Sequence, residues 1–272
     1  MTLISEVLGY KRQSYYKQLH EHQTKAETDQ EIRRLVCQER KRLPKVGGWK
    51  LHYLLRNALQ SHGISCGRDR LFTVLRANDL LIKRKKHYIQ TTDSKHWMKR
   101  YPNLLKDHPP GAPNEAWVSD ITYVRTSEGV CYLSLITDAY SRKIVGYNVG
   151  DSLAASNARC ALQMALRTRP SQDAPLIHHS DRGLQYCSSE YVDLAQRHNI
   201  RMSMTENSDP YENALAERMN RTLKEEFGLG LEITSKHLAG LAVEQAVELY
   251  NNYRPHLSLG YKTPQAVHTK PQ

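Results

Sequence analysis

The sequence has few cysteines, and none of them is paired at short spacing. Its five cysteines, Cys37, Cys66, Cys131, Cys160 and Cys187, form no C-x-x-C motif. Zinc ribbons and zinc knuckles need paired ligands close together in sequence, so the pattern argues against a structural zinc site. We therefore expect five reduced thiols, most of them buried in the folded protein.

Long apolar stretches and several common motifs are also missing. No apolar run reaches the roughly 18 residues of a membrane span, and the first residues, MTLISEVLGYKRQ, lack the apolar segment of a signal peptide. The sequence contains no G-x-S-x-G motif, so a Ser/His/Asp nucleophile is not supported. It also has no internal repeat and no low-complexity tract. These absences favour a globular protein of the cytoplasm.

Charge is abundant but unevenly distributed. The 272 residues carry a formal net charge of +11, and their number suggests two domains. Residues 1–113 contain 23 Lys and Arg against 10 Asp and Glu, whereas residues 114–272 contain 16 against 18. A strongly basic half predicts a polyanionic partner for that half. Nucleic acid fits better than a membrane, because we find no amphipathic or lipidated anchor.

The basic half contains three predicted helical segments. After a helical lead over residues 1–27, Thr28-Asp29-Gln30-Glu31 has the spacing of a capping box and predicts a helix from Thr28 to about residue 42. Further helices are expected over 49–62, with Gly63 as a stop, and from about residue 67. Short helices joined by brief turns indicate a helix-turn-helix type of module over residues 28–91.

Basic residues in and after this module are candidate DNA contacts. The third helix carries Arg68, Arg70 and Arg76, and its charge predicts DNA binding, although small helical bundles without DNA contacts are common. A run of four cations follows: Lys83, Arg84, Lys85 and Lys86. This run is either a solvated linker start or a contact to backbone phosphates, and the two interpretations are compatible. Residues 92–113, which contain four prolines, are interpreted as an extended linker.

The second half changes to β-rich patterns. Runs over 117–124, 130–140 and 143–150 are rich in β-branched and aromatic residues and lie at hairpin-like distances. Further strands are expected over 175–180 and 200–205, and helices over 152–167, 188–198, 212–228 and 235–253. An antiparallel meander followed by parallel strands reached through helices describes an α/β domain with a mixed sheet.

Three carboxylates stand in three different elements of this domain. Asp120 lies within the first strand, Asp181 directly follows the strand 175–180, and Glu217 lies on the helix 212–228. Each alone has an ordinary explanation: a polar strand position, a turn or cap aspartate, and a solvated helix glutamate. As a set they suit Mg²⁺ or Mn²⁺, which prefer hard oxygen ligands converging from separate elements.

Other polar residues near these carboxylates have less specific interpretations. Asp138, at a strand end, is interpreted as a turn residue or a support of the site rather than a metal ligand. His178 and His179 either orient Asp181 or simply lie at the end of a strand, and the sequence favours neither alternative.

Several segments together resemble the integrase-core motifs of insertion-sequence transposases, whose superfamily includes the retroviral integrases. These segments are WVSDITYV, LITDAYSRKIVGY, HHSDRGLQY, ENALAERMNRTLKEE and YNNYRPHLSLGYKTP. Asp181 and Glu217 have 35 residues between them, which is the hallmark spacing of the family. The chain is most similar to the second reading frame, OrfB, of the insertion-sequence-three family. PKVGGWKLHYLL resembles that family's N-terminal helix-turn-helix region, so the resemblance covers about 240 residues.

The resemblance implies an RNase H-like fold: a mixed five-stranded sheet flanked by helices over 114–272, preceded by a small all-α helix-turn-helix domain. It implies that Asp120, Asp181 and Glu217 are the catalytic residues and ligands of Mg²⁺ or Mn²⁺, with two ions in each active site. Lys224 would reach DNA. We add Arg221 because it shares a helix stripe with Glu217 and Lys224.

One departure from the family concerns Asn213. The family has an Asp-Asn pair before Ala-x-x-Glu, whereas this chain has Glu212-Asn213. Because the asparagine and an acidic neighbour are retained, we expect Asn213 to keep a contact to the DNA substrate.

By resemblance, the expected function is metal-dependent cleavage at transposon ends to give a 3′-OH, followed by strand transfer. The expected partners are terminal inverted repeats, target DNA and further copies of the chain. The family's first-frame protein, OrfA, normally adds a second helix-turn-helix and a coiled coil that do not precede Met1, so we expect the chain to act with OrfA or fused to it. The alternatives are an RNase H-type nuclease or resolvase without strand transfer, and a transposase-derived DNA-binding regulator.

Overall fold

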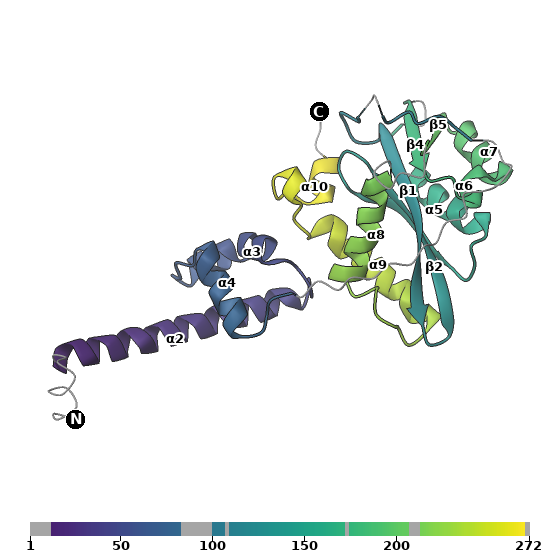
Figure 1. Ribbon diagram of the computed structural model, residues 1–272. Helices are drawn as coiled ribbons and strands as arrows, with labels where there is room; N and C mark the ends of the chain where they lie inside the picture. Colours follow the sequence, from purple (N-terminus) through teal and green to yellow (C-terminus); the bar gives the residue numbers. More distant parts are fainter. Residues whose placement is uncertain (1–11, 83–99, 107–108, 172–173, 207–212, 270–272) are drawn as a thin grey trace. The chain divides into compact units, whose positions relative to one another are not determined.

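The computed structural model describes residues 12–82, 100–106, 109–171, 174–206 and 213–269. The chain divides into two compact units, residues 1–84 and 85–272. In the described part of the first unit Figure 1 shows helices, and in the second it shows a sheet with helices on both faces. The cation run Lys83, Arg84, Lys85 and Lys86, and also Glu212, lie outside the described residues.

The described part of the first unit begins with one continuous helix, α2 (Arg12–Arg40), so the helix start predicted at Thr28 is wrong. Thr28 Oγ1 donates to the carbonyl oxygen of Thr24 at 2.6 Å, a bond that a threonine can form inside a helix. Glu31 pairs with Arg34 at 2.6 Å rather than reaching back to a helix end. The residues before Thr28 include several good helix formers, and the helix therefore continues through the apparent capping box.

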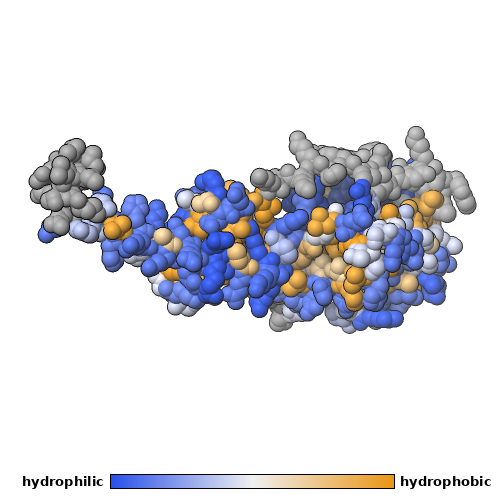
Figure 2. Space-filling model, turned by 90° about the horizontal axis from the view of Figure 1, so that it is seen from below, coloured by the Kyte–Doolittle hydropathy of each residue, from blue (hydrophilic) through white to orange (hydrophobic). Residues whose placement is uncertain are grey.

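The next two helices, α3 (Gly48–Ser61) and α4 (Arg68–Ala77), lie close to their predicted bounds. Gly63, at φ +65°, follows the end of α3 as expected: its N–H donates to Gln60 O, and Ile64 N–H donates to Leu59 O. A left-handed residue in this position satisfies the last carbonyls of a helix. The three helices bury a shared core, which comprises Ile32, Val36, Leu51, Leu55, Leu71 and Leu75. Polar residues dominate the face of this unit seen in Figure 2.

The second unit is built on a five-stranded sheet in the order β3-β2-β1-β4-β5. β1 (Ala116–Thr126), β2 (Gly129–Asp138) and β3 (Ile144–Gly150) form an antiparallel meander. β4 (Leu176–Ser180) runs parallel to β1, and β5 (Ile200–Met204) runs parallel to β4. The predicted mixed sheet is confirmed, and it has the RNase H-like arrangement.

Helices cover both faces of the sheet (Figure 1). α5 (Ala155–Arg167), α6 (Leu184–Cys187) and α7 (Ser189–Arg197) enclose one core with Trp117 and Ile136 of the sheet. α8 (Ala214–Glu226) and α9 (Lys236–Asn252) enclose the other with Val124 and Leu133. The chain ends with the short helices η2 (Leu257–Leu259) and α10 (Pro264–His268). Alternation along β1 puts Asp120 and Val124 on the same face, which is the face that α8 covers.

The close packing of β3 against α5 requires a glycine. A Cβ atom added to Gly146 would lie 2.2 Å from the carbonyl oxygen of Ala161 and 2.9 Å from the Cβ of Ala165. Backbone oxygen cannot move aside as a flexible side chain can. The absence of a side chain at Gly146 therefore sets how closely the helix approaches the sheet.

The structure can be compared with the predictions on the cysteines and on membrane-spanning segments. All five cysteines are free thiols, as expected, but the expectation that most are buried is wrong. Only Cys131 is buried, while Cys37 and Cys160 are exposed on helices, where a small side chain is tolerated at the surface. Within the described ranges, no helix has the length and apolar character needed to cross a membrane.

Candidate active site

The register between β1 and β4 brings two of the predicted carboxylates together. The two strands are parallel, and Ser119 is paired with Ser180. Asp120 is the next residue on β1, and Asp181 directly follows β4, so the two stand side by side at the point where β4 ends. Neighbouring strands are roughly 4.8 Å apart, and the two carboxylates consequently repel each other at short range.

Glu217 approaches the same place from α8. The helix packs on the sheet through the buried residues Ala216 and Met219, and Glu217 lies on its exposed surface. Burial raises the pKa of Glu217, Arg221 opposes the shift, and the Asp181 carboxylate adds to it. In the described part of the chain, no three His, Cys, Asp or Glu side chains stand close enough to hold a metal ion together. The three carboxylates share one electrostatic environment but do not form a closed ligand set.

Asp120 has a strongly raised pKa. Burial raises its pKa to about 7, and the Asp181 carboxylate is the second cause, with a smaller contribution from Glu217. Hydrogen bonds from Asn220 and from the N–H of Ile121 act in the opposite direction. The side chain is surrounded by protein atoms although part of it remains open to solvent. A carboxylate cluster with this much mutual repulsion suits a nearby cation.

A polar stripe of α8 faces Asp120. Its members are Asn213, which directly precedes the helix, Glu217, Asn220 and Lys224, and their spacings of four, three and four residues keep them on one side. Asn220 Nδ2 donates to Asp120 Oδ2 at 2.7 Å, and Asn213 Nδ2 donates to the carbonyl oxygen of Ser119 at 3.1 Å. The Oδ1 atoms of both asparagines are buried without a hydrogen-bond partner among the described residues. The sequence reasoning missed Asn220, although its place on this stripe was a usable signal.

Two of the cations of α8, Lys224 and Arg221, differ in position. Lys224 is half-buried; burial lowers its pKa, and the Asp120 carboxylate partly offsets that effect. Its Nζ lies 3.7 Å from the centroid of the Tyr123 ring on β1. Arg221 is exposed and acts electrostatically on Glu217. Lys224 is thus within the site, whereas Arg221 lies at its solvent side.

Asp181 also shapes the turn after β4. Its Oδ1 accepts a hydrogen bond from the N–H of Gly183 at 3.1 Å, a local bond typical of turn aspartates. The following Arg182 donates from Nε to the carbonyl oxygen of Thr205 at 2.7 Å and also from Nη2 to that of Glu206. The turn interpretation therefore has a structural basis, and the same carboxylate contributes to the field at Asp120.

The two strand histidines are held by buried neighbours. His178 Nε2 lies 2.7 Å from Ser119 Oγ and 2.8 Å from the hydroxyl of Tyr191. Burial, aided by His179, lowers the pKa of His178 to about 3, so this ring is neutral near pH 7. His179 Nδ1 lies 2.8 Å from Ser203 Oγ. These contacts fix β4 between its neighbours.

Asp138 belongs to a turn. Its Oδ1 accepts hydrogen bonds of 2.7 Å from both the N–H and the hydroxyl of Ser141, and its Oδ2 accepts one of 2.7 Å from the N–H of Asn114. These bonds close the connection between β2 and β3. Of the two interpretations drawn from the sequence, the turn residue is the one that these contacts match.

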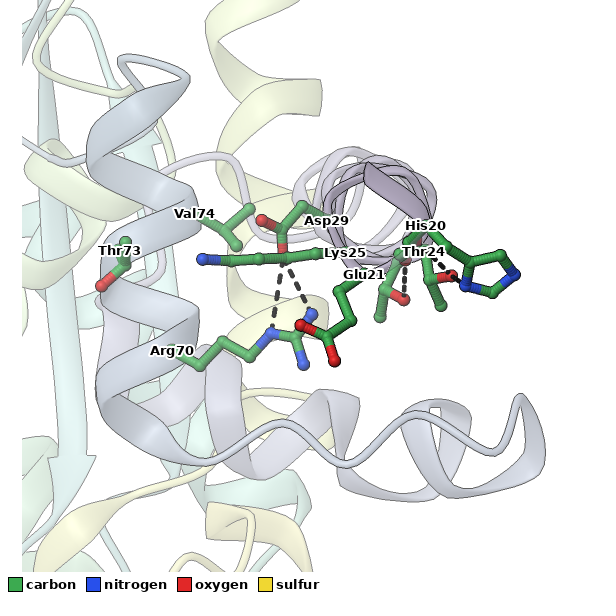
Figure 3. Close-up of a pocket in the computed structure, with 9 residues that line it drawn as sticks. His20, Glu21, Thr24, Lys25, Asp29, Arg70, Thr73 and Val74 are labelled. Carbon is green, nitrogen blue, oxygen red and sulfur yellow. Dashed lines mark hydrogen bonds and ion pairs between the residues drawn. The ribbon is translucent and has the colours of Figure 1, made fainter. Parts of the chain in front are cut away.

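The arginines proposed as DNA contacts lie on α4 of the first unit. Arg68 pairs with Asp69 at 2.7 Å and lies over the Trp49 ring, while Arg76 is exposed. Arg70 reaches from α4 to Asp29 on α2 at 3.1 Å, beside a hollow of about 670 Å³ (Figure 3). Arg70 thus ties two helices together, and Arg68 and Arg76 project from the helix surface.

Comparisons with known proteins match most of the second unit to integrase cores and nearly the whole chain to a protein of an insertion element. Two family models described as "Integrase core domain" match residues 110–210 and 198–264. The "Insertion element IS600 uncharacterized 31 kDa protein" of Shigella sonnei is 35% identical over 269 residues, covering 97% of each chain. The "Transposase InsF for insertion sequence IS3A" of Escherichia coli K12 is 34% identical over 79% of this chain and 75% of its own.

The fold has counterparts among solved structures. A chain in the cryo-EM structure of the simian T-cell lymphotropic virus intasome in complex with the PP2A regulatory subunit B56 gamma matches with a TM-score of 0.51 and 21% identity. The match covers 83% of this chain and 76% of that one. At this identity the likeness establishes the fold.

Proposed function

The chain belongs to the IS3 family of insertion-sequence transposases, enzymes of the polynucleotidyl transferase type that act in DNA transposition. From this premise we propose that it cuts DNA at transposon ends to give a 3′-OH and transfers that end to a second phosphodiester. The proposal is supported by the electrostatic coupling of three carboxylates beside the end of β4, because Asp181 and Glu217 both act on Asp120.

The donor set at this place suits divalent metal. Carboxylates that raise one another's pKa, together with the unpartnered Oδ1 atoms of Asn213 and Asn220, form a cluster of hard oxygen donors. We propose that Asp120, Asp181 and Glu217 hold two Mg²⁺ or Mn²⁺ ions. Such ions polarise the phosphoryl oxygens and lower the pKa of water. Because Glu217 is exposed, its side chain can turn toward the two aspartates to complete the set.

The proposed chemistry needs no covalent link between protein and DNA. In the first step water attacks phosphorus, a P–O bond to the 3′ oxygen breaks, and a 3′-OH and a 5′-phosphate result. In the second step that hydroxyl attacks another phosphodiester, so that one P–O bond forms and one breaks. The chain's own contribution would be to position the strands and stabilise charge at phosphorus. We propose that Lys224 and Arg221, which act electrostatically on the carboxylates, contact DNA, and that Asn213 does so from its position beside Ser119.

DNA is the proposed partner of both units. The excess of cations before residue 114 supports DNA binding by the helices of the first unit, with Arg68 and Arg76 at its surface and the run from Lys83 to Lys86 after it. Joining two ends also calls for more than one copy of the chain, so we propose a homo-oligomer on DNA, acting with OrfA or fused to it. A DNA substrate would place the protein with the nucleoid in the bacterial cytoplasm.

The test is an assay of cleavage and joining on labelled duplexes that carry the terminal repeats of the element, with Mn²⁺. Asp120→Asn, Asp181→Asn and Glu217→Gln should each abolish both steps and leave DNA binding nearly unchanged. Glu248→Gln, a matched change at an exposed glutamate of α9, should retain activity. Normal joining by any of the three variants would remove that residue from the site. Cleavage without joining would favour a nuclease, and binding without either step would favour a regulator.

A further inference from the structure

The ring of Tyr123 is shared by two cations. Lys224 Nζ lies 3.7 Å from the ring centroid, and Arg125 Cζ lies 5.7 Å from it. Both distances are within the range of attraction between a cation and an aromatic face. Tyr123 and Arg125 are on β1, while Lys224 comes from α8, so the cluster joins a strand to a helix.

The cluster lies directly beyond the carboxylates along β1. β4 pairs with β1 only from Ala116 to Ser119, and β1 continues to Thr126. The edge of β1 from Asp120 onward is therefore left uncovered by β4, and Lys224 meets Tyr123 there. The Asp120 carboxylate also acts electrostatically on Lys224, which shows that the cations adjoin the carboxylate site.

The charges of this cluster are not neutralised by salt bridges. Throughout the described ranges, neither Lys224 nor Arg125 forms an ion pair within 4.0 Å. Lys224 is half-buried and Arg125 is exposed, and the two are close enough for Arg125 to oppose the charge on Lys224. Lys224 and Arg125 repel each other at one ring, and Lys224 is also partly removed from water. An anion bound between them would therefore stabilise both charges.

We propose that Tyr123, Arg125 and Lys224 form a subsite for a backbone phosphate of DNA, next to the phosphodiester at the carboxylates. The proposal rests on the function proposed above and adds Tyr123 and Arg125 to it. The guanidinium can bind two phosphate oxygens, the ammonium supplies a point charge, and the ring holds the lysine stem in place. A phosphate is favoured over a protein carboxylate because the proposed substrate is DNA, whose backbone continues past the phosphodiester at the carboxylates.

The test uses the full chain without divalent metal, and measures binding to labelled duplexes over a range of salt concentrations. Loss of one phosphate contact lowers the slope of log K against log salt by about 0.9. Arg125→Gln should lower the slope by this amount. Arg201→Gln, a matched change at an exposed arginine of β5, should not. Tyr123→Phe should bind as the wild type does, and Tyr123→Leu should bind more weakly with a smaller slope.

The outcomes separate this subsite from the proposed function. Equal slopes for Arg125→Gln and Arg201→Gln would overturn the subsite, because Arg125 is exposed and its loss leaves the fold intact. Equal binding by Tyr123→Leu and Tyr123→Phe would also contradict it. If the wild type joins ends but Arg125→Gln binds DNA with the wild-type salt dependence, the subsite is refuted and the proposed function is not. Comparing a terminal-repeat duplex with a mixed-sequence duplex assigns the phosphate to end or target DNA.

Discussion

Asn220 Nδ2 donates a hydrogen bond of 2.7 Å to Oδ2 of Asp120, joining α8 to β1 across 100 residues of sequence. The bond holds the carboxylate in one orientation and favours its ionised form. Asp120 Oδ1 is meanwhile occupied by the N–H of Ile121 at 2.9 Å. Asn220 thus controls the direction in which the Asp120 carboxylate points.

We predict that Asn220→Ala weakens metal binding by roughly 10- to 100-fold, the usual cost of losing a partner that orients a ligand. Because the lost bond lowered the pKa of Asp120, the pH at which Mn²⁺ binding is half-maximal should also rise. Titration of Mn²⁺ at several pH values measures both effects. Asn252→Ala, a matched change at an exposed asparagine of α9, serves as the control, with no change in that pH. An unchanged midpoint in Asn220→Ala would show that the bond does not tune the carboxylate.

We predict that Asp120→Asn stabilises the metal-free protein at high pH. The pKa of Asp120 is raised to about 7, against about 3.9 in an unfolded chain. The native state therefore favours the protonated carboxyl, and this advantage is complete below pH 3.9 and lost as the pH rises to 7. Since part of the side chain meets solvent, we expect Asp120→Asn to gain about 1–2 kcal/mol over the wild type at pH 8 in EDTA.

Urea unfolding of both proteins at pH 5 and pH 8 measures this difference. The advantage of Asp120→Asn should be larger at pH 8, because the wild-type carboxylate is ionised there. An advantage independent of pH would mean that ionisation of the Asp120 carboxylate, disfavoured by burial and by Asp181, is not its cause.

We predict that Mn²⁺ raises the melting temperature of the wild type, because a ligand bound only by the native state stabilises it. Asp181→Asn should respond much less. In EDTA the variant should melt near the wild type, since an asparagine Oδ1 can still accept the hydrogen bond from Gly183. Thermal melts with EDTA and with metal provide the measurement. Clear destabilisation of Asp181→Asn in EDTA would assign the residue to the turn rather than to the metal.

We predict that alanine at Gly146 of β3 and alanine at Gly240 of α9 have opposite effects on the free energy of unfolding. Gly146→Ala places a methyl group 2.2 Å from the carbonyl oxygen of Ala161, and overpacking of this kind costs about 1–3 kcal/mol or more. Gly240→Ala on α9 meets nothing within 4 Å and should stabilise by about 0.5–1 kcal/mol through helix propensity. Denaturant midpoints compare the two. Similar midpoints for both variants would show that α5 can shift away from the sheet.

Much of the second unit could be predicted because its strands carry an unusually clear pattern. The β-branched runs around Asp120 and before Asp181 fixed the strands, and the three carboxylates followed from the resemblance and its spacing. Tyr123 was missed because its role depends on a contact across 100 residues or more, which no local pattern encodes. The spacing along α8 pointed to Asn220 but did not reveal Asp120 as its partner. The prediction of a helix start at Thr28 was wrong for the converse reason, because the helix propensity of the surrounding residues outweighed the local capping-box motif.

Helix α2 is geometrically continuous, but its exposed N-terminal part and its packed C-terminal part unfold in separate steps. Its residues are exposed at every position from 13 to 27, whereas Ile32, Leu35 and Val36 are buried. An isolated, solvent-exposed helix of about 15 residues is only marginally stable in water. Residues 13–27 remain helical here because the packed part of α2 already provides the nucleated helix onto which they extend. Fraying of residues 13–27 disrupts no buried contact. Amide protons there should therefore exchange by local helix–coil transitions, while those beyond Ile32 exchange only when the bundle unfolds.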